Sequence, residues 1–420
     1  MRSGLSFLVA QSTLVELDAA TGLRWAFWIL IGCFVLLPGL VSYLVLAERK
    51  LAGRFQDRVG PNRVGPFGLL QPFADVIKLL TKEGIVPSAA DQWIHLIAPV
   101  LVVMSAFLGL AVIPFGVGLA PVNLPSGIVY LVAVSGLSPL GIFLAGWSSR
   151  SKFSVVGAMR AVAQLVSYEI PQVLSMIPVV LWSGSLSLVT IFDKQLEQGW
   201  FIASPPGLIG FAIFMIAGIA EVNRAPFDLP EAESELIAGY HTEYSGIRFG
   251  LFFLAEYTGI LVICCVATSL YLGGGTPFPF SAFPMNLLGE SRSSLLLTNA
   301  ILLAGFLAKV FALIFLIFWI RATLPRLRVD RLMHFAWKSL VPVSLANILL
   351  AALWFECVLR PGEPYQVLGG NLPGYVVGWI TTGPFAVLLI VFILRFNRPG
   401  SVEPRLQPPS PHLPIKPRPI

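Results

Sequence analysis

Long apolar runs are the feature of this sequence that most constrains its fold. Nine stretches are candidates for crossing a lipid bilayer, since about 20 helical residues span the hydrocarbon core. They are residues 25–47, 94–114, 128–147, 154–182, 207–222, 247–272, 295–320, 338–358 and 375–395. A segment that crosses the bilayer must satisfy its own backbone hydrogen bonds, so each run is predicted to be a helix.

The composition of the 420-residue chain agrees with a membrane location. Hydrophobic residues make up 56% of the chain and charged residues only 12%, about half the share that is usual in soluble domains. The mean hydropathy is +0.81. We therefore expect an all-α integral membrane protein: a polytopic bundle of eight core transmembrane helices plus one C-terminal transmembrane helix.

The predicted spans divide the chain into four parts. Residues 1–24 form an N-terminal external segment, and residues 25–358 form the eight-helix core. Residues 359–398 contain the extra C-terminal transmembrane helix. Residues 399–420 contain eight prolines, which predicts an extended, disordered tail.

The distribution of lysine and arginine predicts the orientation in the membrane. Alternate loops face alternate sides, and one side carries 21 of these residues against 5 on the other. The richer side comprises loops 48–93, 148–153, 223–248 and 321–338 and the C-terminal tail. Positive loops stay in the cytoplasm, so we expect the N-terminus outside and the C-terminus inside, in a bacterial cytoplasmic (inner) membrane. The net charge of +6 is then a signal of topology, and no nucleic-acid partner is expected.

Cysteine and histidine are too scattered to form a metal site. The cysteines all fall in predicted spans without a CxxC pair, and the histidines lie far apart; the eight residues are Cys33, Cys264, Cys265, Cys357, His95, His241, His334 and His412. We expect no metal, flavin or iron–sulfur cluster bound by this chain alone.

The first long loop, 48–93, contains a helical pattern. Apolar residues recur at steps of three and four on one side, namely Leu69, Leu70, Phe73, Val76, Ile77 and Leu80. Gln71, Asp75, Lys78 and Lys82 form the opposite stripe, which predicts an amphipathic interfacial helix. The preceding RVGPNRVGPFG stretch brings Arg58 and Arg63 near its start. A simple membrane anchor is the alternative interpretation.

Loop 223–248 and its flank are acidic, against the trend of the other loops on this side. Within residues 221–244 the basic side chains are Arg224 and His241, and the acids are Glu221, Asp228, Glu231, Glu233, Glu235 and Glu243. Clustered carboxylates raise one another's pKa, which favours proton sharing near neutral pH. A solvated acidic face is the alternative, and a helix start after Pro230 accounts for part of the pattern.

Glu169, Glu256 and Lys309 are ionisable residues that lie well inside predicted spans. Each costs at least about 2.5 kcal/mol at the bilayer centre, so each should face protein or water. With the acidic loop they predict a polar track into the membrane. A structural ion pair, such as Glu256 with Lys309, is the alternative.

Four long blocks resemble a known family. They are similar to loops and helices of the H subunit (subunit 1) of respiratory complex I, the proton-pumping NADH–quinone oxidoreductase. The blocks are Ala47–Glu83, which begins AERKLAGRFQDRVGPNRVGPFG, Gly146–Pro171, Glu221–Tyr257 and Phe318–Pro342. The resemblance covers roughly residues 25–358.

The resemblance implies a role at the junction of the hydrophilic and membrane arms. The chain would form much of the cavity in which quinone, the substrate, reaches an iron–sulfur cluster held by a neighbouring subunit. Arg49, Arg58, Asp75 and Glu83 match positions around this quinone cavity. A carboxylate chain would couple quinone reduction to proton pumping, and its matching residues are Glu169, Glu221, Arg224, Asp228, Glu231, Glu233, Glu235 and Glu256.

The implied partners are the hydrophilic iron–sulfur and quinone-site subunits, the small membrane subunits next to the antiporter-like pumps, quinone and the lipid bilayer. The isolated chain is expected to be inactive.

Two features depart from the family pattern. Segment Ser135–Phe143 carries no acid. In family members with a carboxylate on this helix, that carboxylate would be one link of the proton path, so here the link must be water or another residue. The span at 375–395 and the tail extend beyond the usual eight helices.

Two other functions remain open: the related subunit of a membrane-bound hydrogenase, and a free-standing ion transporter.

Overall fold

The computed structural model describes residues 35–116, 118–228, 238–276, 292–359, 365–367, 370–372 and 374–396. The predicted external segment 1–24, the centre of the acidic loop at 229–237 and the proline-rich tail lie outside the described residues.

Helices account for almost all of the regular structure that is described. They are α3 (Leu37–Phe55), α4 (Gln71–Thr81), α5 (Gln92–Gly109), α6 (Gly127–Ser135), α7 (Leu137–Ser148), α8 (Lys152–Ser183), α9 (Leu188–Gln198), α10 (Pro205–Glu221), α12 (Gly246–Tyr271), α13 (Arg292–Thr323), α14 (Val329–Phe335), α15 (Val341–Leu359) and α16 (Gly374–Phe396). Two short strands, β1 (Tyr365–Val367) and β2 (Gly370–Leu372), pair antiparallel between α15 and α16.

Six described helices are long and apolar enough to cross a membrane. They are Gln92–Val112, Gly127–Ser148, Lys152–Ser183, Gly246–Tyr271, Leu297–Thr323 and Val329–Glu356. Pro205–Glu221 and Gly378–Leu389 are apolar but shorter. The first predicted span, 25–47, lies partly outside the described residues, and α3 continues it to Phe55. The all-helical membrane class is confirmed, whereas the count of eight helices plus one stays a prediction.

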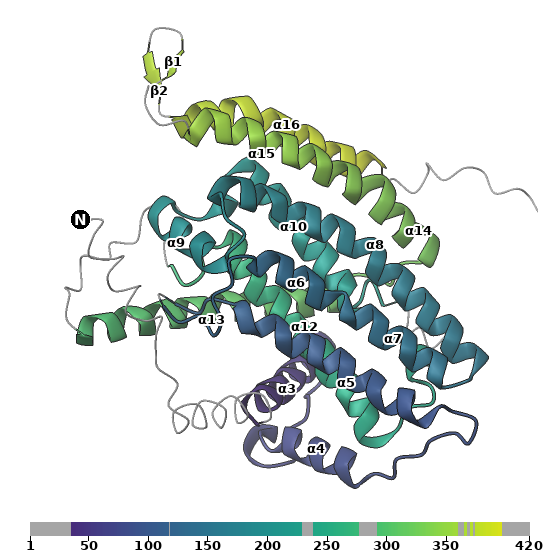
Figure 1. The fold of residues 1–420 in the computed structure, drawn as a ribbon. Helices are drawn as coiled ribbons and strands as arrows, with labels where there is room; N and C mark the ends of the chain where they lie inside the picture. Colours follow the sequence, from purple (N-terminus) through teal and green to yellow (C-terminus); the bar gives the residue numbers. More distant parts are fainter. Residues whose placement is uncertain are drawn as a thin grey trace, which may run out of the picture.

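The long helices run side by side between two ends of the molecule. One end, which we call the charged end, carries the α7–α8 loop and α14; the opposite end carries α9 and the start of α13 (Figure 1). Helix α8 packs against α7, α10 and α15. It runs unbroken through Pro171 and Pro178. Aromatic side chains such as Tyr168, Phe214 and Tyr271 fill the core beside it.

A close backbone approach fixes the end of the acidic loop on α8. The short 3-10 turn η5 (Gly239–His241) packs on this helix. A Cβ atom on Gly157 would lie 2.7 Å from the Gly239 Cα atom, so Gly157 cannot carry a side chain without displacing the loop. Glycine permits this approach, which brings the loop over the membrane helices.

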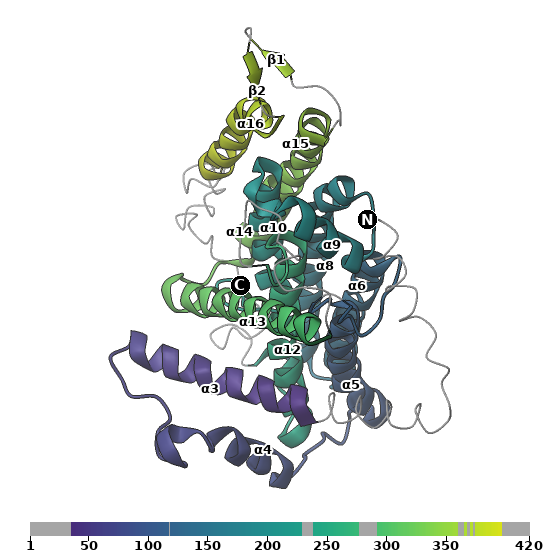
Figure 2. The same cartoon turned by 90° about the vertical axis from the view of Figure 1, so that its left-hand side faces the viewer.

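Helices α3 and α4 form a separate corner of the molecule, with α4 beyond α3 (Figure 2). The predicted amphipathic helix is confirmed as α4. The ring of Phe73 contacts Tyr43 of α3 edge to face at 6.4 Å between centroids. Ile77 and Leu80 remain 60% and 62% exposed, as expected of a face that rests in the membrane interface.

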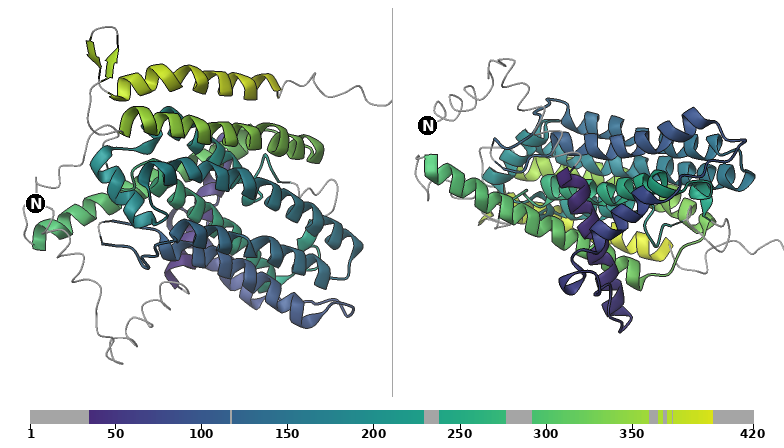
Figure 3. Two further views of the ribbon diagram at one scale, coloured as in Figure 1. Left: turned by 45° about the horizontal axis from the view of Figure 1, so that its top comes forward. Right: turned by 90° about the horizontal axis from the view of Figure 1, so that it is seen from below.

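The extra C-terminal helix lies along the bundle. Helix α16 runs beside α15, joined to it through the β1–β2 hairpin (Figure 3). Trp354 and Trp379 meet edge to face at 6.4 Å between centroids, and α16 also contacts α10.

Candidate functional site

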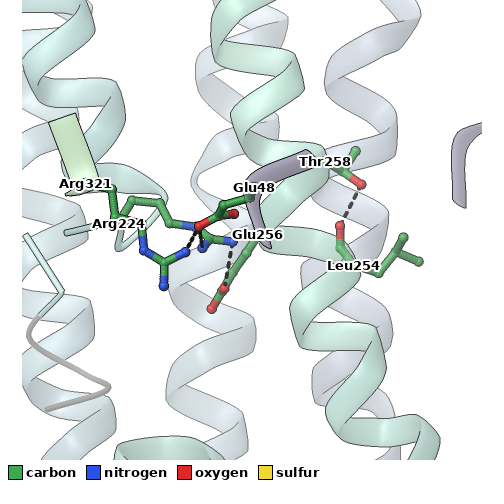
Figure 4. Close-up of polar contacts among 6 residues, drawn as sticks. All are labelled: Glu48, Arg224, Leu254, Glu256, Thr258 and Arg321. Carbon is green, nitrogen blue, oxygen red and sulfur yellow. Dashed lines mark hydrogen bonds and ion pairs between the residues drawn. The ribbon is translucent and has the colours of Figure 1, made fainter. Parts of the chain in front are cut away.

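A buried arginine between two glutamates forms the centre of the candidate site. The Arg224 guanidinium lies 3.5 Å from Oε1 of Glu48 and 3.7 Å from Oε2 of Glu256 (Figure 4). The three side chains are 7%, 7% and 11% exposed. The guanidinium also lies over the Tyr257 ring, 4.1 Å from its centroid. Mutual compensation is what permits such charges to be buried.

A second arginine extends this ion cluster. Arg321 of α13 pairs with Glu48 of α3, so four segments far apart in the sequence meet here (Figure 4). We call Glu48, Arg224, Glu256 and Arg321 the ion cluster. The suggested pair of Glu256 with Lys309 is wrong, because Glu256 pairs with Arg224. The Lys309 ammonium instead binds backbone carbonyls.

Gln164 of α8 holds the segment that carries Arg224. Its amide Nε2 donates to the carbonyl of Ala220 at 2.8 Å and to that of Phe227 at 2.7 Å. Asn223 also accepts from this amide at 3.2 Å. A single buried side chain thereby fixes the turn after α10, and the turn presents Arg224 to the two glutamates.

A cavity of about 120 Å³ lies between α5, α6, α7, α8, α10 and α12. The carboxylates of Glu169, Glu221 and Glu256 line it, together with the polar side chains of Ser135, Ser138, Gln172 and Asn223. This volume holds several water molecules, and the lining offers them hydrogen-bond partners. We call it the carboxylate cavity.

Two of its carboxylates have polar partners, and the charge of one acts on the other. The Ser135 hydroxyl donates to Oε1 of Glu169 at 3.5 Å. Gln172 hydrogen-bonds to Glu221, and the charge of Glu169 acts on Glu221 as well. The segment without an acid, Ser135–Phe143, therefore contributes hydroxyl groups to the cavity wall.

A second cavity of about 470 Å³ opens between α3, α12 and α13. It is lined by Glu48, Arg49, Arg321, Gln56, Tyr257 and apolar side chains that include Phe55 and Phe253. We call it the arginine cavity. Glu48 and Arg321 belong both to its wall and to the ion cluster, and Glu256 of the same cluster lines the carboxylate cavity. The ion cluster thus stands between the two cavities.

The four residues predicted at the quinone cavity are only partly brought together. Arg49 donates to Oδ2 of Asp75 at 2.7 Å, and Gln71 donates to the other oxygen at 3.1 Å. Arg58 bonds to Gln56, a wall residue of the arginine cavity. Glu83 lies beyond α4, where its backbone nears the start of α12.

The acidic loop is described only at its ends. Asp228 pairs with Arg326 at 2.7 Å, whereas Glu231, Glu233 and Glu235 lie outside the described residues. Burial lowers the pKa of His241 to about 3, so this imidazole is neutral at physiological pH. It adds no positive charge to the loop.

Sequence reasoning misses two members of the ion cluster, Glu48 and Arg321. Both lie near the ends of apolar runs, where charged residues are common. Glu48 stands next to Arg49 in the AERK string, and its acidic charge in a basic loop is the one available signal. Its burial depends on packing from distant segments, which the local sequence does not reveal.

Within the described ranges, no group of three or more histidine, cysteine or acidic side chains is placed to hold a metal ion. The ionic groups of the ion cluster are arginines and carboxylates, and carboxylates are groups that can exchange protons with water. These features define a class: a polytopic helical membrane protein with buried ionisable groups between two cavities.

Comparison with known proteins narrows this class to one family. The family described as NADH dehydrogenase matches residues 28–352. The H subunit of NADH-quinone oxidoreductase from Dehalococcoides mccartyi (strain CBDB1) is 47% identical over 350 residues, which cover 82% of this chain and 92% of the relative. The same subunit of Bacillus cytotoxicus is 46% identical over 346 residues, 81% of this chain and 98% of the relative.

The corresponding subunit of Bacillus mycoides is 48% identical over 332 residues, covering 78% of this chain and 94% of the relative. The chain belongs to the family of the NADH-quinone oxidoreductase H subunits, which are membrane subunits of complex I. Helix α16 lies beyond the residues that the family matches.

Proposed function

We propose that this chain forms much of a quinone cavity and couples quinone reduction to proton translocation through its carboxylates. The observation that carries the proposal is the ion cluster between the two cavities. The arginine cavity would receive the headgroup of the quinone. The carboxylate cavity would form the start of the proton path into the membrane. Quinone is the substrate, and electrons reach it from partner subunits.

The coupling follows from electrostatics. Two-electron reduction leaves negative charge on the quinone until protons arrive. At about 4 Å and an effective dielectric constant near 20, one unit charge acts on another by about 4 kcal/mol. One pKa unit corresponds to about 1.4 kcal/mol, so the pKa of a nearby group would move by several units. In this proposal Arg224, which pairs with two glutamates, passes such a change from one cavity to the other.

The proposed path uses the carboxylates that line the cavity and those of the loop. Glu169, Glu221 and Glu256 share the carboxylate cavity, and Ser135 and Ser138 supply the link that lacks an acid. Asp228, Glu231, Glu233 and Glu235 would continue the path along the acidic loop, with Arg224 as its cationic member.

The proposed quinone approach uses Arg49, Arg58, Asp75 and Glu83. Arg58→Ala and Asp75→Ala are expected to raise the apparent KM for quinone severalfold or to abolish turnover, because each removes a charge beside the arginine cavity. The measurement is steady-state quinone reduction by the purified complex. Unchanged kinetics in a fully assembled double variant would remove these residues from the quinone approach.

The proposed orientation places the N-terminus outside and the C-terminus in the cytoplasm of a bacterial inner membrane. A reporter fused after Ile420 is expected to be active only on the cytoplasmic side, because the positively charged loops share that side. The check is a pair of fusions, one to a cytoplasmic reporter and one to a periplasmic reporter. Periplasmic activity would mean that the number of membrane spans differs from nine by an odd number.

Two measurements separate the proposal from its alternatives. The chain is expected to purify with the hydrophilic iron–sulfur and quinone-site subunits and with the small membrane subunits beside the antiporter-like pumps. A free-standing transporter would instead be active alone in vesicles. A hydrogenase subunit would purify with a complex that evolves hydrogen and lacks inhibitor-sensitive quinone reductase activity.

A further inference from the structure

Lys309 of α13 occupies a cage of backbone oxygens at the end of the molecule opposite the charged end. Its ammonium donates to the carbonyls of Leu272 at 2.5 Å, Gly274 at 2.8 Å and Thr276 at 2.6 Å. The indole ring of Trp200 covers it, with the nitrogen 3.8 Å from the ring centroid. Three oxygens and one aromatic face thus surround one cation.

The cage is built by the turn that follows α12, Leu272–Thr276, and neighbouring helices hold this turn rigidly. Gln195 of α9 accepts from the Gly273 amide at 2.8 Å and donates to the Ser269 carbonyl at 2.7 Å. The Thr276 hydroxyl donates to the Gly273 carbonyl at 2.9 Å and accepts from the Trp200 indole at 2.5 Å.

Close backbone contact fixes the other side of the turn. A side chain on Gly275 would collide with the backbone of Leu302 on α13. Gly305, one turn further along α13, lies against the Gly275 carbonyl in the same way. The turn therefore packs directly on α13, and three of its carbonyls bind the Lys309 ammonium.

The electrostatics of the cage favour a cation strongly. The carbonyls of Leu272, Gly274 and Thr276 follow Tyr271, the last residue of α12, and so lie at the negative end of the helix dipole. They lie next to a membrane span, where an unsatisfied backbone group costs several kcal/mol. Carbonyl cages at such distances also replace the hydration shell of small free cations.

We propose that the turn Leu272–Thr276 is a preformed binding site for a small primary ammonium ion, which the chain fills with its own Lys309. The site lines neither the carboxylate cavity nor the arginine cavity, so the proposal does not depend on the proposed function. Filling the site joins α9, α12 and α13 at the end opposite the charged end.

The test is rescue of the assembled complex by a diffusible cation. Lys309→Ala removes the ammonium and leaves space, so we expect less assembled complex and a lower apparent Tm. Methylammonium in the growth medium and the buffers is expected to restore at least half of both losses, in a saturable manner. Tetramethylammonium at equal ionic strength is expected to restore neither loss, because it cannot donate hydrogen bonds.

Two further variants make every outcome decisive. Lys309→Met fills the same space without charge, so its losses should not respond to methylammonium. Lys194→Ala removes a lysine of α9 at the same end of the molecule and should leave abundance and Tm unchanged. The proposal is overturned if Lys309→Ala loses nothing, if methylammonium restores neither its abundance nor its Tm, or if Lys309→Met is rescued equally.

Discussion

Replacing Arg224 by methionine is expected to remove most of the assembled complex. The guanidinium is the shared partner of Glu48 and Glu256, and all three side chains are almost fully buried. Removing one partner of a buried ion pair leaves an uncompensated charge and costs about 3–5 kcal/mol. The measurement is the abundance and the apparent Tm of the complex in native gels and thermal scans.

Compensating and control variants separate charge from packing. Glu256→Gln in the Arg224→Met background removes the carboxylate charge that loses Arg224, whereas Glu48 keeps its pair with Arg321, so part of the lost abundance should return. Arg49→Met is the matched control, since Arg49 also pairs with a carboxylate but is 50% exposed. Exposed pairs contribute at most about 1 kcal/mol. Equal losses for the arginine variants at positions 49 and 224 would contradict the buried-charge account.

Neutralising Glu169 or Glu221 is expected to slow proton translocation at least tenfold, a change that corresponds to about 1.4 kcal/mol in an activation free energy. Both carboxylates line the carboxylate cavity, and glutamine keeps their shape while it removes the exchangeable proton. The rate of proton uptake in vesicles reports the effect. Low abundance with normal activity per complex would instead assign these residues a structural role.

The sequence predicts the helices well because the bilayer imposes a simple rule. The run at 154–182 is the core of α8 (Lys152–Ser183), and the run at 207–222 corresponds to α10 (Pro205–Glu221). Helix α9 (Leu188–Gln198) is not among the predicted elements, because it is short and not strongly apolar. Contacts with α12 satisfy its buried Gln195, and only the folded chain provides them.

Residues of the candidate site can be predicted from the sequence where a charged residue stands in an apolar run. Glu169 and Glu256 stand out in the sequence because a charge inside an apolar run is costly. Glu48 and Arg321 do not, because they lie where spans meet loops. The partners of Lys309 cannot be predicted from the sequence either, because they are backbone carbonyls, which every residue has.

The number of protons translocated per quinone reduced is the quantity that tests the coupling role most directly. It should be measured in vesicles that contain the assembled complex, with Glu169→Gln and Glu221→Gln compared with the unmodified chain. Glu197→Gln is the matched control, because Glu197 is exposed on α9 and lines neither cavity. The account predicts a lower ratio in the two cavity variants and an unchanged ratio in the control. A normal ratio together with a normal rate of quinone reduction in both cavity variants would contradict it.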